Sequence, residues 1–252
     1  MSLLSVELKE RLWSMAAAGI CHVPERLRLI CLESPLTVPL GIENLRIIAH
    51  SRDEYYERAQ SAAKEPFTVN WLRAMSASGL FIDIGANVGA YSLMAARLCG
   101  GLQVLAIEPS GPTYASLCEN ISINGLGDQI EPIPMALNRY TGMGTFAYSS
   151  CRPGAALHNQ TPSNGQRIMH WRLDDLLIWG RWPTPTHIKI DVDGGEVNVL
   201  TGMPRALRSA SSIMIEIDDT NLDEARTLLT LAGKQMMNSW RVGSTTRNYL
   251  YE

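Results

Sequence analysis

The sequence predicts an α/β fold in which a mostly parallel sheet is closed by an antiparallel last strand and preceded by an N-terminal helical cap. From Gly79 onward, short apolar runs alternate with helical segments, which is typical of parallel strands joined by crossover helices. The chain finishes in two strand-like runs around Gly243-Ser244-Thr245-Thr246, a pattern that predicts an antiparallel hairpin. The residues up to Ser78 lack this alternation. We therefore divide the chain into residues 1–78 and residues 79–252.

The first part, residues 1–78, is predicted to be mainly helical. Apolar residues recur at helical spacing from Leu4 to Ile20, and Pro24 opens a second short helix. A further helix is expected over residues 66–77. The exception is a short strand expected at residues 45–48.

The second part, residues 79–252, is predicted to carry the sheet. We expect strands at 80–84, 103–107, 129–134, 187–190 and 212–217, helices at 88–98, 112–123, 196–200 and 221–232, and hairpin strands at 234–242 and 248–252. Strands and helices in this alternation indicate a parallel sheet covered on both faces. Residues 149–166 interrupt the pattern with prolines, glycines and asparagines and no periodicity. A loop of that length inside a compact domain is typically functional or disordered.

Composition excludes several classes of protein. The 252 residues can bury one large core, and a net charge of -3 with a pI near 6.0 argues against a nucleic-acid partner. No apolar run is long enough to cross a bilayer, and the N-terminus has no basic region before an apolar stretch. The five cysteines are scattered and lack CxxC spacing, which argues against a zinc cluster or a disulfide framework. We expect a cytoplasmic protein without a membrane partner.

Residues 81–89 (Phe-Ile-Asp-Ile-Gly-Ala-Asn-Val-Gly) carry the strongest functional signal. Asp83 stands two residues before Gly85, at the end of a predicted strand. An acid there would repel a pyrophosphate but suits a ligand with an ammonium and a sulfonium. Gly85 is expected to let the backbone approach the ligand, and the amides of Ala86 and Asn87 to meet its carboxylate. The segment favours S-adenosylmethionine over NAD; a tight turn without a ligand is the alternative.

Glu108 ends the second predicted strand of the sheet, about 25 residues after Asp83, close to the spacing of nucleoside-binding acids. A carboxylate at that position can accept hydrogen bonds from two ribose hydroxyls. Enzymes that bind NAD use the same device, so Glu108 alone does not choose between the two cofactors.

Three further residues are candidates for the proton acceptor. Asp191 and Asp218 each end a later strand, where side chains face the ligand crevice, and His158 lies in the 149–166 loop. Asp191 with Asp218 or Asp219 and Asn221 could also offer oxygen ligands to Mg²⁺. Capping of the next helix by residues 218–221 is the simpler explanation, so no metal is assigned.

Taken in order, these blocks resemble the FkbM family of S-adenosylmethionine-dependent methyltransferases. The matching stretches are residues 81–89 with fiDvGAnvG, 107–109 with fEP, 119–125 with the helix end N-v-x-l-N-g, 134–137 with p-x-A-l, 173–176 with LDdl, and 188–196 with lKiDvEGaE. Asn87 is therefore expected where a stricter glycine pattern would have glycine. Two departures are Asp193 in place of glutamate and Gly195 in place of alanine. At Asp218 the family often has histidine.

The resemblance implies a class I, Rossmann-like methyltransferase fold with seven strands. It implies cofactor contacts from Gly89, Pro109, Ala136 and Asp191, in addition to the residues above. It also implies transfer of a methyl group, most often to a hydroxyl of a small specialised metabolite such as a polyketide or a sugar. A Mg-dependent catechol-type enzyme and an N-methyltransferase are the alternatives, ahead of an NAD-dependent oxidoreductase and a non-catalytic binding module. Residues 1–78, with the 149–166 loop, are interpreted as a lid over the acceptor or a static cap, and a homo-oligomer stays open.

Overall fold

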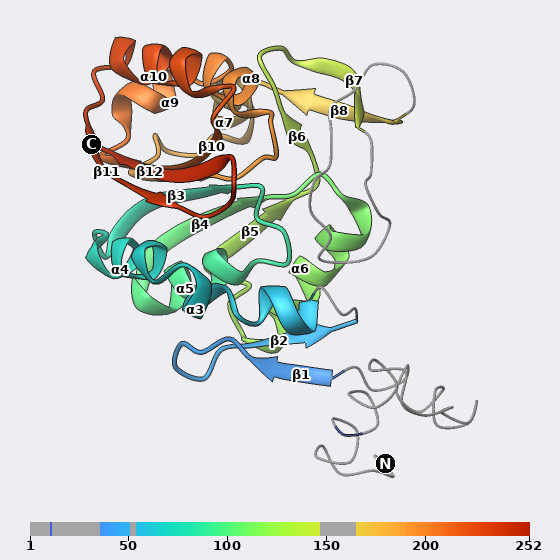
Figure 1. Ribbon diagram of the computed structural model, residues 1–252. Coiled ribbons are helices and arrows are strands. Elements are labelled where there is room, and N and C mark those ends of the chain that lie inside the picture. The colour runs from blue at the N-terminus through green and yellow to red at the C-terminus, as the bar shows by residue number, and fades with distance from the viewer. Residues whose placement is uncertain (1–10, 12–35, 51–53, 147–164) are drawn as a thin grey trace.

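The computed structural model describes residues 11, 36–50, 54–146 and 165–252 and is built on a seven-stranded sheet (Figure 1). The strand order is β11-β12-β10-β9-β3-β4-β5. The strands are β3 (Ser78–Ile84), β4 (Gly101–Ile107), β5 (Ile130–Ile133), β9 (His187–Ile190), β10 (Ser212–Asp218), β11 (Met236–Arg241) and β12 (Thr246–Tyr251).

The direction of the strands confirms the predicted sheet. Strands β5, β4, β3, β9 and β10 pair in parallel, whereas β12 runs antiparallel to both of its neighbours, β10 and β11. The consecutive parallel strands β3 and β4, β4 and β5, and β9 and β10 are joined through helices, and β11 and β12 form the predicted terminal hairpin.

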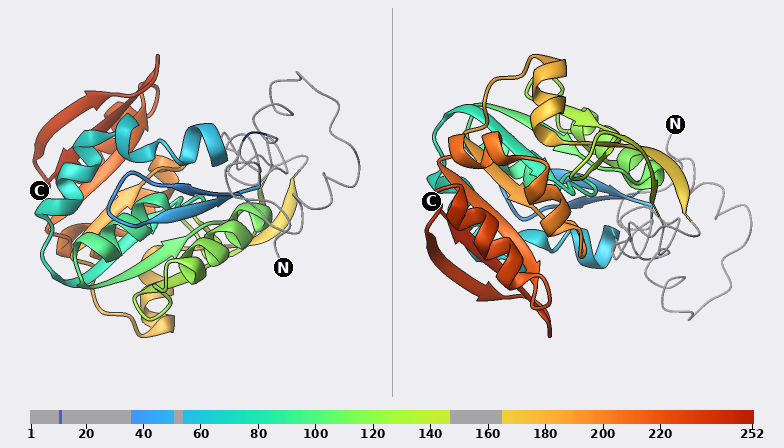
Figure 2. Two further views of the ribbon diagram at one scale, coloured as in Figure 1. Left: turned by 90° about the horizontal axis from the view of Figure 1, so that it is seen from below. Right: turned by 90° about the horizontal axis from the view of Figure 1, so that it is seen from above.

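Helices cover both faces of the sheet, as the alternation of the sequence predicted (Figure 2). Along β3, Phe81 packs into the core beneath one face and Ile82 into the core beneath the other. The first core includes α4 (Pro66–Ala74), α5 (Ala90–Leu98) and α6 (Gly111–Ile123); the second includes α7 (Leu173–Gly180), α8 (Glu196–Thr201), α9 (Pro204–Ser209) and α10 (Leu222–Leu231). None of the described helices is both long and apolar enough to span a membrane.

The described N-terminal residues form more than the predicted helices. An antiparallel hairpin of β1 (Leu36–Pro39) and β2 (Arg46–Ala49) comes first, followed by the π-helical turn η1 (Glu54–Arg58), α3 (Ser61–Lys64) and α4. The predicted strand at 45–48 corresponds to β2, while β1 was not predicted. Apart from residue 11, the helices predicted before residue 31 lie outside the described residues.

The hairpin shares its core with the sheet domain. Leu36, Leu40 and Ile47 belong to the same buried cluster as Phe81 of β3. The buried side chain of Asn120 on α6 adds two hydrogen bonds, accepting one from the Ile48 amide at 2.7 Å and donating one to the Val88 carbonyl at 2.9 Å. The hairpin is therefore fastened to the turn after β3. The division at residue 78 stays a prediction.

A small second sheet lies beyond β5, with the order β6-β8-β7. Its strands are β6 (Ala136–Leu137), β7 (Gly142–Phe146) and β8 (Gln166–Trp171). The sequence did not predict it, because β6 has two residues and β7 contains two glycines, which weaken a strand pattern. Most of the predicted 149–166 loop lies outside the described residues; its last residue, Gln166, begins β8.

Candidate functional site

The carboxyl ends of four adjacent parallel strands gather the acidic residues of the candidate site. The chain leaves β3 for β4 on one side and later adds β9 on the other, so the sheet reverses its order at β3. Ligands of open α/β sheets bind outside the strand ends at such a point. Asp83, Glu108 and Asp191, all predicted as site residues, are brought together there, and Glu216 of β10 lies beside them.

The glycine turn after β3 is held by its neighbouring strands. Gly85 has φ +78°, and a Cβ on it would lie 1.9 Å from the carbonyl oxygen of Asp191. The amides of Gly85 and Ala86 both donate to the Ile107 carbonyl, at 2.9 and 3.0 Å. We had assigned Gly85 to close approach of a ligand, but its closest described neighbour is the backbone of β9. Gly89, at φ +88°, similarly faces the side chain of Leu117.

Glu108 joins this turn to the next one. It is 4% exposed; its Oε2 accepts from the Asn87 amide at 3.0 Å and its Oε1 from the Ser110 amide at 2.8 Å. Burial raises the pKa of Glu108 to about 7, against the lowering effect of the two amides. Each oxygen keeps a further lone pair, which can receive a ribose hydroxyl.

These contacts bear on one expectation from the sequence. The amides of Ala86 and Asn87, predicted to meet a ligand carboxylate, already donate to Ile107 and Glu108 within the protein. That carboxylate therefore needs other donors.

Asp83 has one oxygen engaged and one without a hydrogen bond. It is 1% exposed, and its Oδ2 accepts from the Ser92 hydroxyl at 2.6 Å. Its Oδ1 is buried and accepts from none of the described residues. Burial raises the pKa of Asp83, and Lys189 is the strongest of the influences that lower it. A buried acceptor without a donor is costly, so this oxygen fits a ligand that brings a charged N–H group.

Lys189 is a residue that the sequence analysis missed. It is 2% exposed, donates to Asp191 Oδ2 at 2.8 Å, and stands beside Asp83 in the register of β9 and β3. Its Nζ lies 4.7 Å from the centre of the Tyr91 ring. Burial alone would lower the pKa of Lys189, but Asp191, Asp83 and Glu65 raise it above its ordinary value. The available signal was the charged residue inside the apolar run His187-Ile188-Lys189-Ile190.

Asp191 is paired rather than free. Burial acts to raise its pKa, yet the ammonium of Lys189 brings the pKa of Asp191 below its ordinary value. Its side chain keeps 33% of its surface exposed, so it still faces the crevice.

Glu216 is the second residue missed by the sequence analysis. It lies two residues before Asp218 on β10 and its Oε2 accepts a long hydrogen bond, 3.4 Å, from Asn248. Burial, followed by the nearby Asp191, raises the pKa of Glu216 to about 8. The available signal was again a charged residue inside an apolar run, here Ile215-Glu216-Ile217.

Asp218 and Asn221 serve the turn before α10. Asp218 Oδ1 accepts from the amide and the hydroxyl of Thr220, at 3.0 and 2.6 Å, and these bonds lower the pKa of Asp218. Asn221 donates to Glu196 Oε2 at 2.7 Å. Within the described parts of the chain, no three His, Cys, Asp or Glu side chains are grouped to hold a metal. Asp218 and Asn221, two residues of the magnesium arrangement considered from the sequence, are thus engaged within the protein, and that arrangement stays untested.

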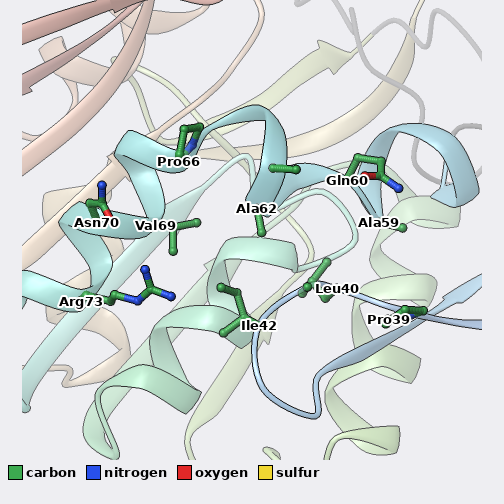
Figure 3. A pocket seen from close by; sticks show the side chains of 12 residues that line it. Pro39, Leu40, Ile42, Ala59, Gln60, Ala62, Pro66, Val69, Asn70 and Arg73 are labelled. Carbon is green, nitrogen blue, oxygen red and sulfur yellow. The ribbon is translucent and has the colours of Figure 1, made fainter.

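The remaining predicted residues are placed as follows. Pro109 follows Glu108 after the end of β4, Ala136 is buried in β6, and His158 lies outside the described residues. A separate hollow of about 410 Å³ lies between the β1–β2 turn and helices α3 and α4 (Figure 3). It contains none of the acids described above.

Two solved structures share this architecture. A precorrin-6y C5,15-methyltransferase from Geobacter metallireducens matches with a TM-score of 0.51 at 15% identity, over 81% of this chain and 92% of that one. A SAM-dependent methyltransferase from Agrobacterium tumefaciens matches with a TM-score of 0.51 at 13% identity, over 86% of this chain and 70% of that one. The fold is therefore that of the Rossmann-like methyltransferases.

Comparison of the sequence assigns the chain to one family within this fold. The model of the methyltransferase FkbM domain matches residues 83–236, and the chain belongs to this methyltransferase family. A curated relative, the hexuronic acid methyltransferase AglP of Haloferax volcanii, is 25% identical over 191 residues, which cover 76% of this chain and 77% of the relative.

Proposed function

We propose that this protein uses S-adenosylmethionine to methylate a hydroxyl oxygen of a small polar acceptor, such as a sugar or another specialised metabolite. The observation that carries the proposal is the buried Oδ1 of Asp83, which accepts no hydrogen bond from the described residues and lies at the glycine turn. The ammonium of an amino-acid cofactor supplies the missing donor. The hexuronic acid named for AglP supports a sugar as the acceptor.

The residues of the strand ends have separable tasks in this reaction. Asp83 would hold the cofactor's ammonium, and the free lone pairs of Glu108 would hold its ribose hydroxyls. The bound cofactor supplies a methyl group made electrophilic by its sulfonium. Holding the two reactants in line lowers the barrier, because it removes the entropy cost of their encounter. Asp191, which is ionised and keeps 33% of its side chain exposed at this edge, is our candidate to take the hydroxyl proton.

Cofactor binding is tested by isothermal titration of the purified protein with S-adenosylmethionine and, separately, with NADH. We expect Asp83→Asn to weaken S-adenosylmethionine binding about 10- to 100-fold, because a hydrogen bond to a charged group contributes about 1.5–3 kcal/mol. Asp128→Asn is the matched control, since Asp128 is exposed and precedes β5 at the opposite edge of the sheet. Unchanged affinity in Asp83→Asn, or binding of NADH alone, would overturn the proposal.

The acceptor is tested with a methyl hexoside, a methyl hexuronide, a catechol and a primary amine, each incubated with the enzyme and isotopically labelled cofactor. We expect label in a sugar product that survives mild alkali, as a methyl ether does and a methyl ester does not. Label in the amine or in an alkali-labile ester would contradict transfer to a hydroxyl oxygen.

A further inference from the structure

The strand ends hold a buried cluster of charges around one lysine. Lys189 projects from β9 on the face that α4 and α5 cover, where its neighbours are acidic or polar. The groups facing it are Asp83 on β3, Asp191 directly after β9, Glu216 on β10, Tyr91 on α5 and Glu65 just before α4, while Arg58 of η1 acts on Asp191.

The carboxylates of this cluster outnumber the ammonium. Lys189 makes its ion pair with Asp191 at 2.8 Å and lies beside Asp83 in the strand register. Buried carboxylates that share a site cannot all ionise without a compensating cation, because each raises the cost of charging the next. The charge of Lys189 therefore decides how many of them are anions.

The ammonium of Lys189 is already engaged within the protein, because its Nζ donates to Asp191 Oδ2 at 2.8 Å and lies 4.7 Å from the centre of the Tyr91 ring. We therefore take Lys189 to act on a ligand through the carboxylates beside it. Of these, Asp83 is the one with an oxygen that no described residue occupies.

Resting on the proposed function, we propose that Lys189 is a positioning residue of the cofactor site. Its buried ammonium opposes the effect of burial on Asp83 and favours the anion, whose Oδ1 can then receive the ammonium of S-adenosylmethionine. Without that charge, Asp83 takes up a proton at neutral pH and loses its attraction for the ligand.

The test is the pH dependence of S-adenosylmethionine affinity in Lys189→Met, which keeps the length of the side chain and removes its charge. Titrations run from pH 5.5 to 7.5, where the ligand's amino group, with a pKa of about 7.7–8.0, stays mostly protonated. An opposite charge within a few ångströms lowers the pKa of an aspartate by about 1–3 units. As the pH is lowered, protonation of Asp83 weakens binding of S-adenosylmethionine. We therefore expect this loss of affinity to begin about 1–3 pH units higher in Lys189→Met than in the wild type.

Lys234→Met is the matched control. Lys234 is also partly buried, but it donates to the Ala210 carbonyl near the amino end of β10, away from the site. We expect its pH profile to follow the wild type. A loss in Lys189→Met by the same factor at every pH would mean a purely structural lysine, and an unchanged profile would mean no coupling to Asp83. Either result overturns the inference, whereas a wild type that binds no S-adenosylmethionine overturns the proposed function itself.

A second measurement does not depend on the variant folding. Carbon NMR of labelled aspartate carboxyls in the wild type follows Asp83 and Asp191 through the same pH range. We expect Asp191 to ionise at a lower pH than Asp83, because Lys189 donates directly to Asp191. An Asp83 that keeps its proton to pH 7.5 contradicts the inference.

Discussion

Gly85→Ala tests whether the glycine turn is required by the sheet or by the ligand. Gly85 has φ +78°, and an added Cβ would lie 1.9 Å from the Asp191 carbonyl oxygen and 2.9 Å from its carbon. Both atoms belong to the backbone, so no side chain can move aside. The substitution forces the ends of β3 and β9 apart, where the Asp191 amide donates to the Ile84 carbonyl at 3.0 Å.

The expected loss follows from two contributions. Alanine in the left-handed region costs about 1–2 kcal/mol, and breaking a buried backbone hydrogen bond costs about 1–3 kcal/mol more. The sum is about 2–5 kcal/mol, a large share of the 5–15 kcal/mol that typically stabilises a domain.

Gly233→Ala provides the control that separates these contributions. Gly233 has φ +84°, nearly the same backbone conformation, but a Cβ on it would have no atom within 4 Å. We expect this variant to lose only the conformational part, about 1–2 kcal/mol. Urea unfolding of both variants at pH 7, with equal m-values, gives the comparison. Equal losses, within about 0.5 kcal/mol, would refute the close approach as the reason for glycine at position 85.

Two further substitutions test other parts of the structure. Because burial raises the pKa of Glu216 from 4.5 to about 8, the folded protein keeps a proton there that the unfolded chain has lost, and stability falls as the pH rises through that window. Glu216→Gln should therefore be more stable than the wild type above pH 8, by on the order of 5 kcal/mol, and equal to it below pH 4.5. A stability difference that does not vary with pH in urea unfolding would contradict this. Asn120→Ala should lower the free energy of unfolding by about 2–4 kcal/mol, since it removes both hydrogen bonds of a buried amide. An unchanged melting temperature in scanning calorimetry would show that Asn120 does not link β2 to the turn after β3.

The sheet was predictable from the sequence because its signals are local. Apolar runs such as Leu80–Ile84 are interrupted by helical segments, and the terminal turn at residues 243–246 marks the antiparallel hairpin. The small sheet of β6, β7 and β8 was not predicted, because its pairing joins residues that lie far apart in the sequence. Strand β1 was not predicted either, since four residues ending in Pro39 show too little periodicity to indicate a strand.

The site was predictable in its acids but not in their partners. Asp83, Glu108 and Asp191 follow from their position at strand ends, which the sequence pattern locates. Lys189 and Glu216 did not, because their importance comes from neighbours on other strands. The partners of the Ala86 and Asn87 amides could not be predicted for the same reason, since the acceptors, Ile107 and Glu108, lie at the end of the next strand.

The amide of Asn120 has a consequence for dissecting the protein. A fragment that begins at residue 79 would contain every predicted cofactor residue, yet it would leave this buried side chain without its donor from Ile48 and strip the outer surface of α5 and α6 of the hairpin that covers it. Such a fragment keeps the predicted cofactor residues but lacks part of its hydrophobic core. We therefore expect the sheet domain to be stable when fused to another N-terminal segment only if that segment supplies a strand whose amide donates to Asn120.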